Sequence, residues 1–182
     1  MAISTQTIYM EAALACASIA SMYDLRTRRI PNKLTLPAIL FGLALHLYRG
    51  GPAEMGWSAL AGLIAGGVFL LFFLAGGMGA GDVKLMTAVG CLVGTGNIKE
   101  VLLATVIIGA VMGIALAIYR GQFRQTLLNV TTLVQHHRAE GLAEHPELNV
   151  RNPSSLRLPY ALPIAAGCLV TFLMVSGKEL IR

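Results

Sequence analysis

Charged residues are scarce in this chain of 182 residues: 13% are Asp, Glu, Lys or Arg, whereas 55% are hydrophobic. A soluble domain typically carries about 25% charged residues. A deficit of this size, spread over the whole chain, excludes an ordinary water-soluble domain and indicates a membrane protein. The net charge of +5 therefore gives no reason to expect a nucleic-acid partner.

Metal-binding and disulfide patterns are also missing. The three cysteines, Cys16, Cys91 and Cys168, lie in apolar runs without a CxxC pair or a nearby histidine. We therefore expect buried thiols and neither a zinc site nor a disulfide framework. A cluster of His136, His137 and His145 near Glu144 leaves a metal as an alternative. Solvation in a polar loop explains these residues better, so no metal or cofactor is predicted.

Long apolar runs are what the chain does have. A membrane-spanning helix needs about 20 mostly apolar residues. Six segments approach this, and together they predict an all-α, polytopic membrane protein folded as one domain over residues 1–182. The segments are 3–23, 34–48, 57–76, 83–97, 101–119 and 158–176. The start of the chain lacks the basic residues of a signal peptide.

Basic residues gather in alternate loops between these segments. Ten of the fourteen Lys and Arg residues fall on one side, which the excess of positive charge marks as cytoplasmic. They are Arg26, Arg28, Arg29, Lys33, Lys84, Arg120, Arg124, Arg138, Arg151 and Arg157. The pattern predicts a multi-pass protein of the inner (plasma) membrane with both termini outside.

The loop 120–157 is the one long polar region. Phe123, Leu127, Val130 and Val134 recur there at helical spacing. This pattern predicts an amphipathic helix over 122–136 that lies on the inner leaflet of the membrane. A soluble connector is the alternative.

Aspartate is rare, and the only two are Asp24 and Asp82. An ionisable residue at membrane depth is a candidate functional residue, as is Glu11, to which we assign no role. Each aspartate also has an ordinary explanation. Asp24 can be an interfacial carboxylate balanced by nearby arginines, and Asp82 can be a helix N-cap.

Four glycines favour a functional interpretation of Asp82, because they crowd the six residues before it. Such a run allows positive φ angles and close approach of a second chain. Two carboxyl groups close enough to share a proton can hydrolyse a peptide bond, one as base toward water and the other as acid. The predicted topology puts both aspartates at the cytoplasmic interface. The four glycines are Gly76, Gly77, Gly79 and Gly81.

GAGDVKLM (residues 79–86) resembles the GxGD signature of membrane-embedded aspartyl peptidases. Coupled to DLRTRRIPN (24–32), it is similar to the type IV prepilin peptidases, and LPYALPIAAG (158–167) resembles a proline-containing segment of that family. The resemblance implies that Asp24 and Asp82 are the catalytic pair. Residues in the matching motifs would support the site: Gly79, Gly81, Lys84, Arg26, Pro31 and Asn32.

The resemblance also implies the reaction and the substrate. The enzyme would be an aspartic-type endopeptidase that cuts a prepilin or pseudopilin at the cytoplasmic interface. It would remove a short basic leader that ends in glycine and is followed by an apolar helix. Longer members carry a domain with paired CxxC motifs that is associated with N-methylation. This chain looks more like the short form that serves Tad/Flp pili, so methyltransferase activity is not expected.

Three alternatives remain at this point. An intramembrane protease would share the GxGD motif but cut inside a substrate helix. A small transporter or channel would also place carboxylates near a glycine-broken helix. A structural membrane subunit would tolerate loss of both aspartates.

Lys84 has two possible roles: it can lie at the inner interface of the membrane, or it can assist the carboxylates. Pairs of small residues four positions apart are expected to pack within the bundle. They are Gly62/Gly66, Gly90/Gly94 and Gly109/Gly113.

Overall fold

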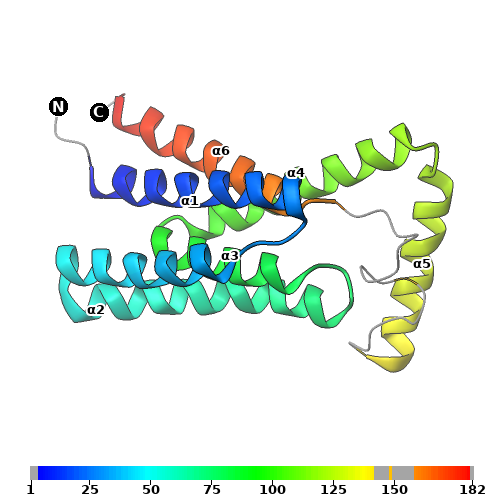
Figure 1. Cartoon of the computed structure of the whole chain (residues 1–182), viewed down its shortest axis with the longest axis horizontal. Helices are drawn as coiled ribbons and strands as arrows, with labels where there is room; N and C mark the ends of the chain where they lie inside the picture. Colours follow the sequence, from blue (N-terminus) through cyan, green and yellow to red (C-terminus); the bar gives the residue numbers. More distant parts are fainter. Residues whose placement is uncertain (1–3, 142–147, 149–157, 181–182) are drawn as a thin grey trace.

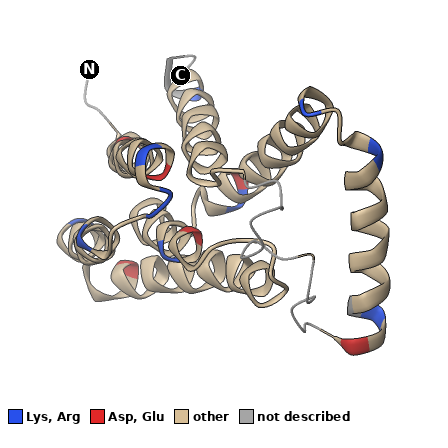
Figure 2. Ribbon diagram, turned by 45° about the vertical axis from the view of Figure 1, so that its right-hand side comes forward, with Lys and Arg blue, Asp and Glu red and all other residues tan. Residues whose placement is uncertain are grey.

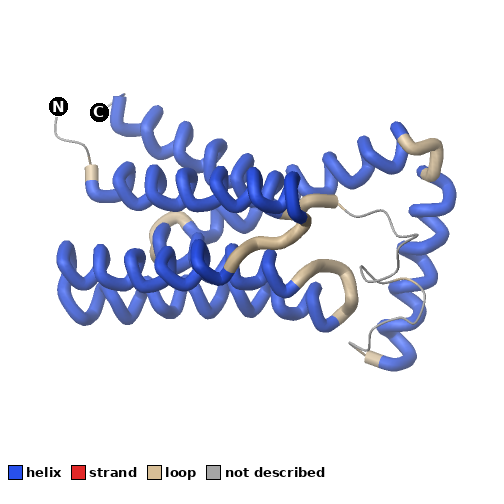
Figure 3. Tube along the Cα trace, in the orientation of Figure 1, coloured by secondary structure: helices blue, strands red, loops and turns tan. Residues whose placement is uncertain are grey.

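The computed structural model describes residues 4–141, 148 and 158–180. These residues form helices joined by short loops, with no strand among them (Figures 1 and 3). The all-α prediction is therefore confirmed. The helices are α1 (Thr5–Thr27), α2 (Asn32–Leu74), α3 (Ala80–Val93), α4 (Ile98–Tyr119), α5 (Phe123–Glu140) and α6 (Ala161–Leu180).

Helix α1 extends further than the predicted segment 3–23. Its first turn is capped by Ser4, whose hydroxyl accepts a hydrogen bond from the Thr7 amide at 3.3 Å. It ends at Arg28, which has a left-handed backbone with φ 53° and ψ 29°. Asp24 therefore lies in the last helical turn instead of in the connection that follows. Glu11 lies near the opposite end of α1 and is exposed.

Helix α2 contains the second and third predicted segments. Its two parts, 32–50 and 52–74, meet at Gly51, the one residue inside α2 with a non-helical backbone (φ 77°, ψ −170°). Figure 1 shows the chain reversing there, so that the two parts lie side by side. The expected connection over 49–56 was too long, because glycine adopts positive φ without strain and Pro52 suits the first turn of a helix.

Helix α3 is the core of the bundle. Leu85, Met86 and Val89 are fully buried, and both parts of α2 pack against α3. A Cβ atom at Gly90 would lie 2.7 Å from the Ala61 carbonyl oxygen. A Cβ at Gly42, in the other part of α2, would lie equally close to the backbone of Cys91. Glycine therefore allows the helices to approach at backbone distance.

The predicted small-residue contacts are confirmed within this core. Gly62 packs on Cys91, Gly66 on Thr87, and the Gly94 backbone lies against the ring of His46. The three cysteines are free and buried, as expected.

Helices α4 and α6 pack on each other, and α6 also packs on α1. A Cβ at Gly167 of α6 would lie 2.9 Å from the Thr105 amide nitrogen of α4. A helix does occupy the segment predicted over 122–136: α5 begins at Phe123 and extends to Glu140. Phe123, Leu127 and Val130 on its apolar face are all about half exposed.

Three of the described helices are long and apolar enough to cross a membrane: α2, α4 and α6. The end of α1, both turns flanking α2, the end of α4 and the start of α6 lie at one end of the bundle (Figure 1). Figure 2 shows long parts of the helices without a charged residue, with charges mainly near helix ends and on α5. The fold thus gathers one set of helix ends beside α5.

Candidate active site

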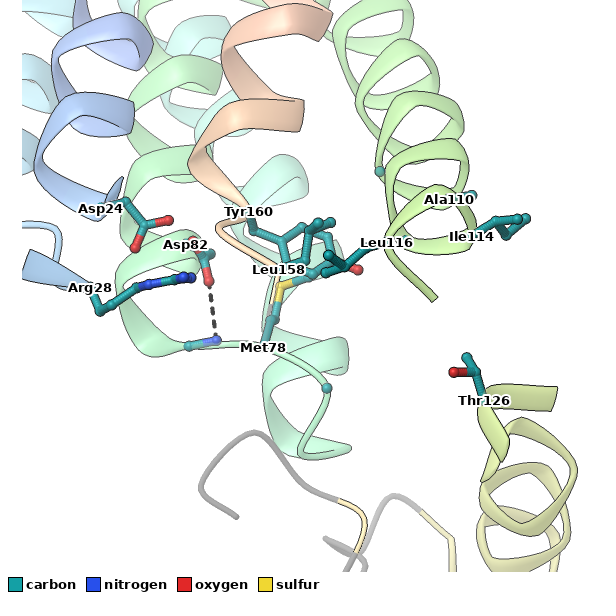
Figure 4. A pocket seen from close by; sticks show the side chains of 14 residues that line it. Asp24, Arg28, Met78, Asp82, Ala110, Ile114, Leu116, Thr126, Leu158 and Tyr160 are labelled. Atoms are coloured by element: carbon teal, nitrogen blue, oxygen red, sulfur yellow. Dashed lines mark hydrogen bonds between the residues drawn. The ribbon is translucent and has the colours of Figure 1, made fainter. Parts of the chain in front are cut away.

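A cavity of about 490 Å³ opens at this end of the bundle, and both aspartates line it (Figure 4). Asp24 comes from the last turn of α1 and Asp82 from the first turn of α3. Gly77, Met78 and Gly79 contribute the loop before α3, and Leu158 and Tyr160 the approach to α6. Helix α4 and Thr126 of α5 form the remaining wall. Residues that are distant in the sequence thus meet at one site, as the predicted topology required.

Asp24 is only 8% exposed, and its Oδ2 atom is buried without a hydrogen-bond partner among the described residues. Asp24 follows the first predicted spanning segment and so lies at a helix end. Burial raises the pKa of its carboxyl group, whereas a hydrogen bond with the Ala161 backbone and the charge of Arg28 lower it. Because a buried unpaired carboxylate oxygen is costly, this atom is suited to bind a water molecule, a proton or a substrate group.

Asp82 is the third residue of α3 and precedes the fourth predicted spanning segment. Its Oδ2 atom accepts a hydrogen bond of 3.1 Å from the Gly79 amide. Gly79 is therefore the N-cap, which corrects the alternative that Asp82 itself caps the helix. Burial raises the pKa of Asp82 to about 7. The hydrogen bond from Gly79 lowers it, and the charge of Asp24 raises it further.

This arrangement supplies what carboxyl catalysis needs. The two aspartates are close enough for the charge of one to raise the pKa of the other. A carboxyl group with a pKa near neutrality can hold a proton while its partner is ionised. Which of the two holds the proton is a property of the pair.

The glycine run before Asp82 serves two different purposes. Gly76 has a φ of 75° and ends the turn after α2. A Cβ at Gly81 would lie 3.3 Å from the Cβ atom of Ile30, so this glycine allows α3 to begin against the connection between α1 and α2. Positive φ is thus confirmed at Gly76, and Gly81 allows a close contact within this chain. Close approach of a second chain stays a prediction.

The two sequence motifs that flank the aspartates are joined directly. The Lys84 ammonium group donates a hydrogen bond of 3.0 Å to the Asn32 side-chain oxygen. Pro31 caps the start of α2 with an extended backbone. None of these three residues lines the cavity. The Lys84–Asn32 hydrogen bond connects the two motifs beside it.

Arg28 lines the cavity although the sequence motifs did not single it out, whereas Arg26 is exposed and lies outside the lining. A supporting role for Arg26 stays a prediction. The left-handed backbone at Arg28, which ends α1, turns the chain there, and spacing alone does not reveal it. Tyr160 also lines the cavity; its position inside the quoted segment 158–167 was the available signal.

The described residues give no support to the alternative of a metal site at the histidines of the loop 120–157. His136 lies 3.7 Å from the Glu140 carboxylate, one turn further along α5. The side chain of His137, and His145 and Glu144 altogether, lie outside the described part of the structure.

Residues 12–116, which include both aspartates, match the model of the type IV leader peptidase family. The chain belongs to this family. The match covers the helices α2 and α3 completely and most of α1 and α4. The geometry described above is therefore that of a type IV leader peptidase domain.

Curated relatives agree with the family assignment. A prepilin leader peptidase/N-methyltransferase of Burkholderia pseudomallei is 36% identical over 119 residues, covering 60% of this chain and 38% of that protein. Proteins of the same name from Aeromonas hydrophila and Bacillus subtilis are 39% and 31% identical over 105 and 100 residues. Each of these matches covers 53% of this chain, and they cover 36% and 40% of the two relatives. No solved structure matches the chain.

Proposed function

We propose that this type IV leader peptidase domain is a membrane-embedded aspartyl endopeptidase. Its substrate is a prepilin-like or pseudopilin-like peptide, from which it removes a short basic leader after a glycine. One observation carries the proposal: Asp24 and Asp82 line the same cavity, where the Asp24 Oδ2 atom is buried and has no partner in the part of the chain that the structure describes.

The chemistry follows from the shared proton. The ionised carboxyl group takes a proton from a water molecule, whose oxygen attacks the carbonyl carbon of the scissile bond. The protonated carboxyl group donates its proton to the carbonyl oxygen. Collapse of the tetrahedral intermediate breaks the C–N bond, and the leaving amine takes up a proton. Asp82, with a pKa of about 7, can act as the acid at neutral pH.

The cavity also favours cleavage at the membrane surface over cleavage inside the bilayer. Both aspartates lie in terminal turns of their helices, at the end of the bundle that also contains α5. This placement supports an active site that faces the cytoplasm. It disfavours the alternative of an intramembrane protease, and no observation favours a transporter or a channel.

We further propose that six segments cross the inner (plasma) membrane: α1 up to Tyr23, the two parts of α2, α3 from Val83 onward, α4 and α6. The reversal of α2 at Gly51 and the alternation of helix ends support this number. Both termini would then lie outside. The half-exposed apolar face of α5 supports its placement on the inner leaflet. The packing of α1 and α2 on α3, and of α6 on α1 and α4, supports a single peptidase domain over residues 1–182.

The test is processing of a coexpressed prepilin that carries a basic leader ending in glycine, followed by gel shift. Asp24→Asn and Asp82→Asn remove the proton chemistry and keep the size of the side chain. We expect each change to reduce cleavage by at least about 100-fold, because general acid–base catalysis contributes roughly 10²–10⁴-fold.

Glu100→Gln is the matched control, because Glu100 is exposed in the first turn of α4 and does not line the cavity. All three variants should be recovered from the membrane in similar amounts. Full processing by either aspartate variant would contradict the mechanism.

A further inference from the structure

The backbone of Ala161, the first residue of α6, contacts the side chain of Asp24 on α1. A helix leaves its first four N–H groups without partners inside the helix, and the Ala161 amide is one of them. It donates a hydrogen bond to the Asp24 carboxyl group; burial raises the pKa of Asp24, and this bond opposes the rise. The start of α6 thus supplies a donor, at the positive end of the helix dipole, to a buried carboxyl group.

Ser21, one turn before Asp24 on α1, contacts the other backbone group of the same residue. Its hydroxyl group donates a hydrogen bond of 2.7 Å to the Ala161 carbonyl oxygen and lies 2.8 Å from the Ala17 carbonyl oxygen. A hydroxyl group has one proton to donate, so the two carbonyl groups share it. Ser21 is 5% exposed and Ala161 is fully buried. The contact therefore joins α1 to α6 inside the bundle.

Ala161 is thus held by both of its backbone groups, its C=O by Ser21 and its N–H by Asp24. Residues three apart on a helix are neighbours on its surface, so one face of α1 makes both contacts. The Asp24 Oδ2 atom has no partner among the described residues, so the amide bonds the other carboxyl oxygen. One oxygen of Asp24 is therefore fixed at α6, and the second is left for the chemistry in the cavity.

The position of the α6 start decides how the Asp24 carboxyl group is oriented. Apolar packing between α1 and α6 is non-directional, whereas a hydrogen bond specifies which atoms meet. Without the bond from Ser21, the Ala161 amide could shift relative to the last turn of α1. A reacting carboxyl group has to lie within hydrogen-bond reach of its proton partner, so such a shift would slow the reaction.

We propose that Ser21 is a positioning residue of the active site: its hydroxyl group holds the start of α6 where the Ala161 amide fixes the Asp24 carboxyl group. The effect on rate rests on the proposed peptidase function, whereas the contact itself needs no substrate. The motif DLRTRRIPN begins three residues after Ser21, so neither of the motifs that contain the aspartates includes it.

Ser58 provides a matched control. Its hydroxyl group donates a hydrogen bond of 2.6 Å to the Cys91 carbonyl oxygen and so joins α2 to α3, as Ser21 joins α1 to α6. Both serines are buried, and neither lines the cavity. Ser21→Ala and Ser58→Ala each remove one such bond and leave a smaller side chain. A loss of stability alone would therefore affect both variants in the same way.

Titration of Asp24 tests the contact without requiring cleavage. The chain contains only two aspartates, so the full-length protein with ¹³C-labelled aspartate carboxyl groups gives two NMR signals in detergent, and Asp82→Asn assigns them. Loss of a hydrogen bond to the ionised form raises the pKa of a carboxyl group, so we expect the Asp24 midpoint in Ser21→Ala to rise by about 0.5–1 pH unit. Ser58→Ala should leave it unchanged. A midpoint that does not rise in Ser21→Ala, or an equal rise in both variants, would overturn the proposal.

Kinetics connects the contact to the reaction. With the coexpressed prepilin as purified substrate, Ser21→Ala should lower kcat about tenfold and change KM less than about twofold, because Ser21 orients a reacting group and does not bind the substrate. The pair must lose one proton to provide a base, so the acid limb of the pH profile of kcat should move to higher pH. The other titratable groups that line the cavity, Arg28, Asp82 and Tyr160, are left in place. Ser58→Ala should keep the kcat and the pH profile of the unsubstituted protein.

The two measurements separate this proposal from the proposed function. If the unsubstituted protein cleaves the substrate and Ser21→Ala keeps its kcat, the positioning role is wrong and the peptidase function stands. The same conclusion follows if both serine variants lose the same fraction of kcat. If no cleavage occurs but the Asp24 midpoint rises in Ser21→Ala alone, the contact stands and the peptidase function fails.

Discussion

At the scale of single residues, Asp24 and Asp82 have different surroundings although each lies in a terminal helical turn. Asp24 has a buried oxygen without a partner among the described residues; burial raises the pKa of Asp24, and the nearby charge of Arg28 offsets part of this rise. Asp82 receives a backbone hydrogen bond from Gly79 and has a pKa raised to about 7. Such a difference allows one carboxyl group to remain protonated while the other is ionised.

The raised pKa of Asp82 predicts how activity depends on pH. Asp82 loses its proton as the pH rises through about 7, so the pair loses the proton it shares. We expect kcat to fall above about pH 7 when processing is measured between pH 5 and 9. A rate that stays constant up to pH 9 would show that Asp82 does not supply the proton.

The same shift predicts an effect on stability with a definite sign. Between the ordinary pKa of 3.8 and about 7, the folded state binds this proton more tightly than the unfolded state. Stability contributed by Asp82 is therefore lost as the pH rises through that window. Asp82→Asn should raise the thermal midpoint in detergent at pH 8 and leave it almost unchanged at pH 4. The expected rise is roughly 2–4 °C for each kcal/mol recovered. Glu100→Gln should change the midpoint at neither pH.

At the scale of elements, the close packing of α3 on α2 depends on glycines at their contact. It has only 14 residues, or about 21 Å, and is buried against both parts of α2. Its position brings Asp82 to the cavity, and the Lys84–Asn32 hydrogen bond connects its first turns to the start of α2. A change in the contact between α2 and α3 should therefore affect both stability and the site.

Gly90→Ala tests this contact. The new Cβ atom would lie 2.7 Å from the Ala61 carbonyl oxygen and 2.8 Å from the Gly62 Cα atom, so backbone must move. Overpacking of this kind typically costs about 1–3 kcal/mol. We expect a lower thermal midpoint in detergent for Gly90→Ala and an unchanged or slightly higher one for Gly67→Ala, which has open space. Equal midpoints for the two variants would contradict the close contact.

At the scale of the whole molecule, the alternation of helix ends decides which groups meet. The ends of α1 and α4 and the starts of α3 and α6 lie together beside α5 (Figure 1). The cavity forms where these ends converge. The proposed orientation places this end, with the basic loops, in the cytoplasm.

Cysteine labelling with a membrane-impermeant maleimide tests the orientation. Arg138→Cys in α5 and Lys99→Cys at the start of α4 both replace exposed residues. In intact cells only Lys99→Cys should react, and in inverted vesicles only Arg138→Cys. The unsubstituted protein, with buried cysteines, provides the background. The opposite pattern would reverse the proposed topology.

Much of this molecule could be predicted from the order of its residues. Apolar length and scarce charge predicted an all-helical membrane protein, because the period and extent of such segments are local properties. The pairing of Asp24 with Asp82 was also predictable, since alternating segments place both at one end. The motifs that flank the two aspartates also indicated the family, and the match over residues 12–116 confirms it.

Other features required the folded chain, because they depend on directions in space. The reversal at Gly51, the choice of Arg28 over Arg26 as a cavity residue, and the Lys84–Asn32 hydrogen bond arise from backbone angles and packing between distant segments. Glycine pairs on α2, α3 and α4 look alike in sequence, yet those of α2 and α3 pack inside the bundle while Gly113 faces a cavity. The sequence by itself determined the helices and the end of the bundle at which the two carboxyl groups lie. Only the tertiary structure decided which helix surfaces pack against each other and which line an open cavity, because this depends on how distant helices are arranged in space.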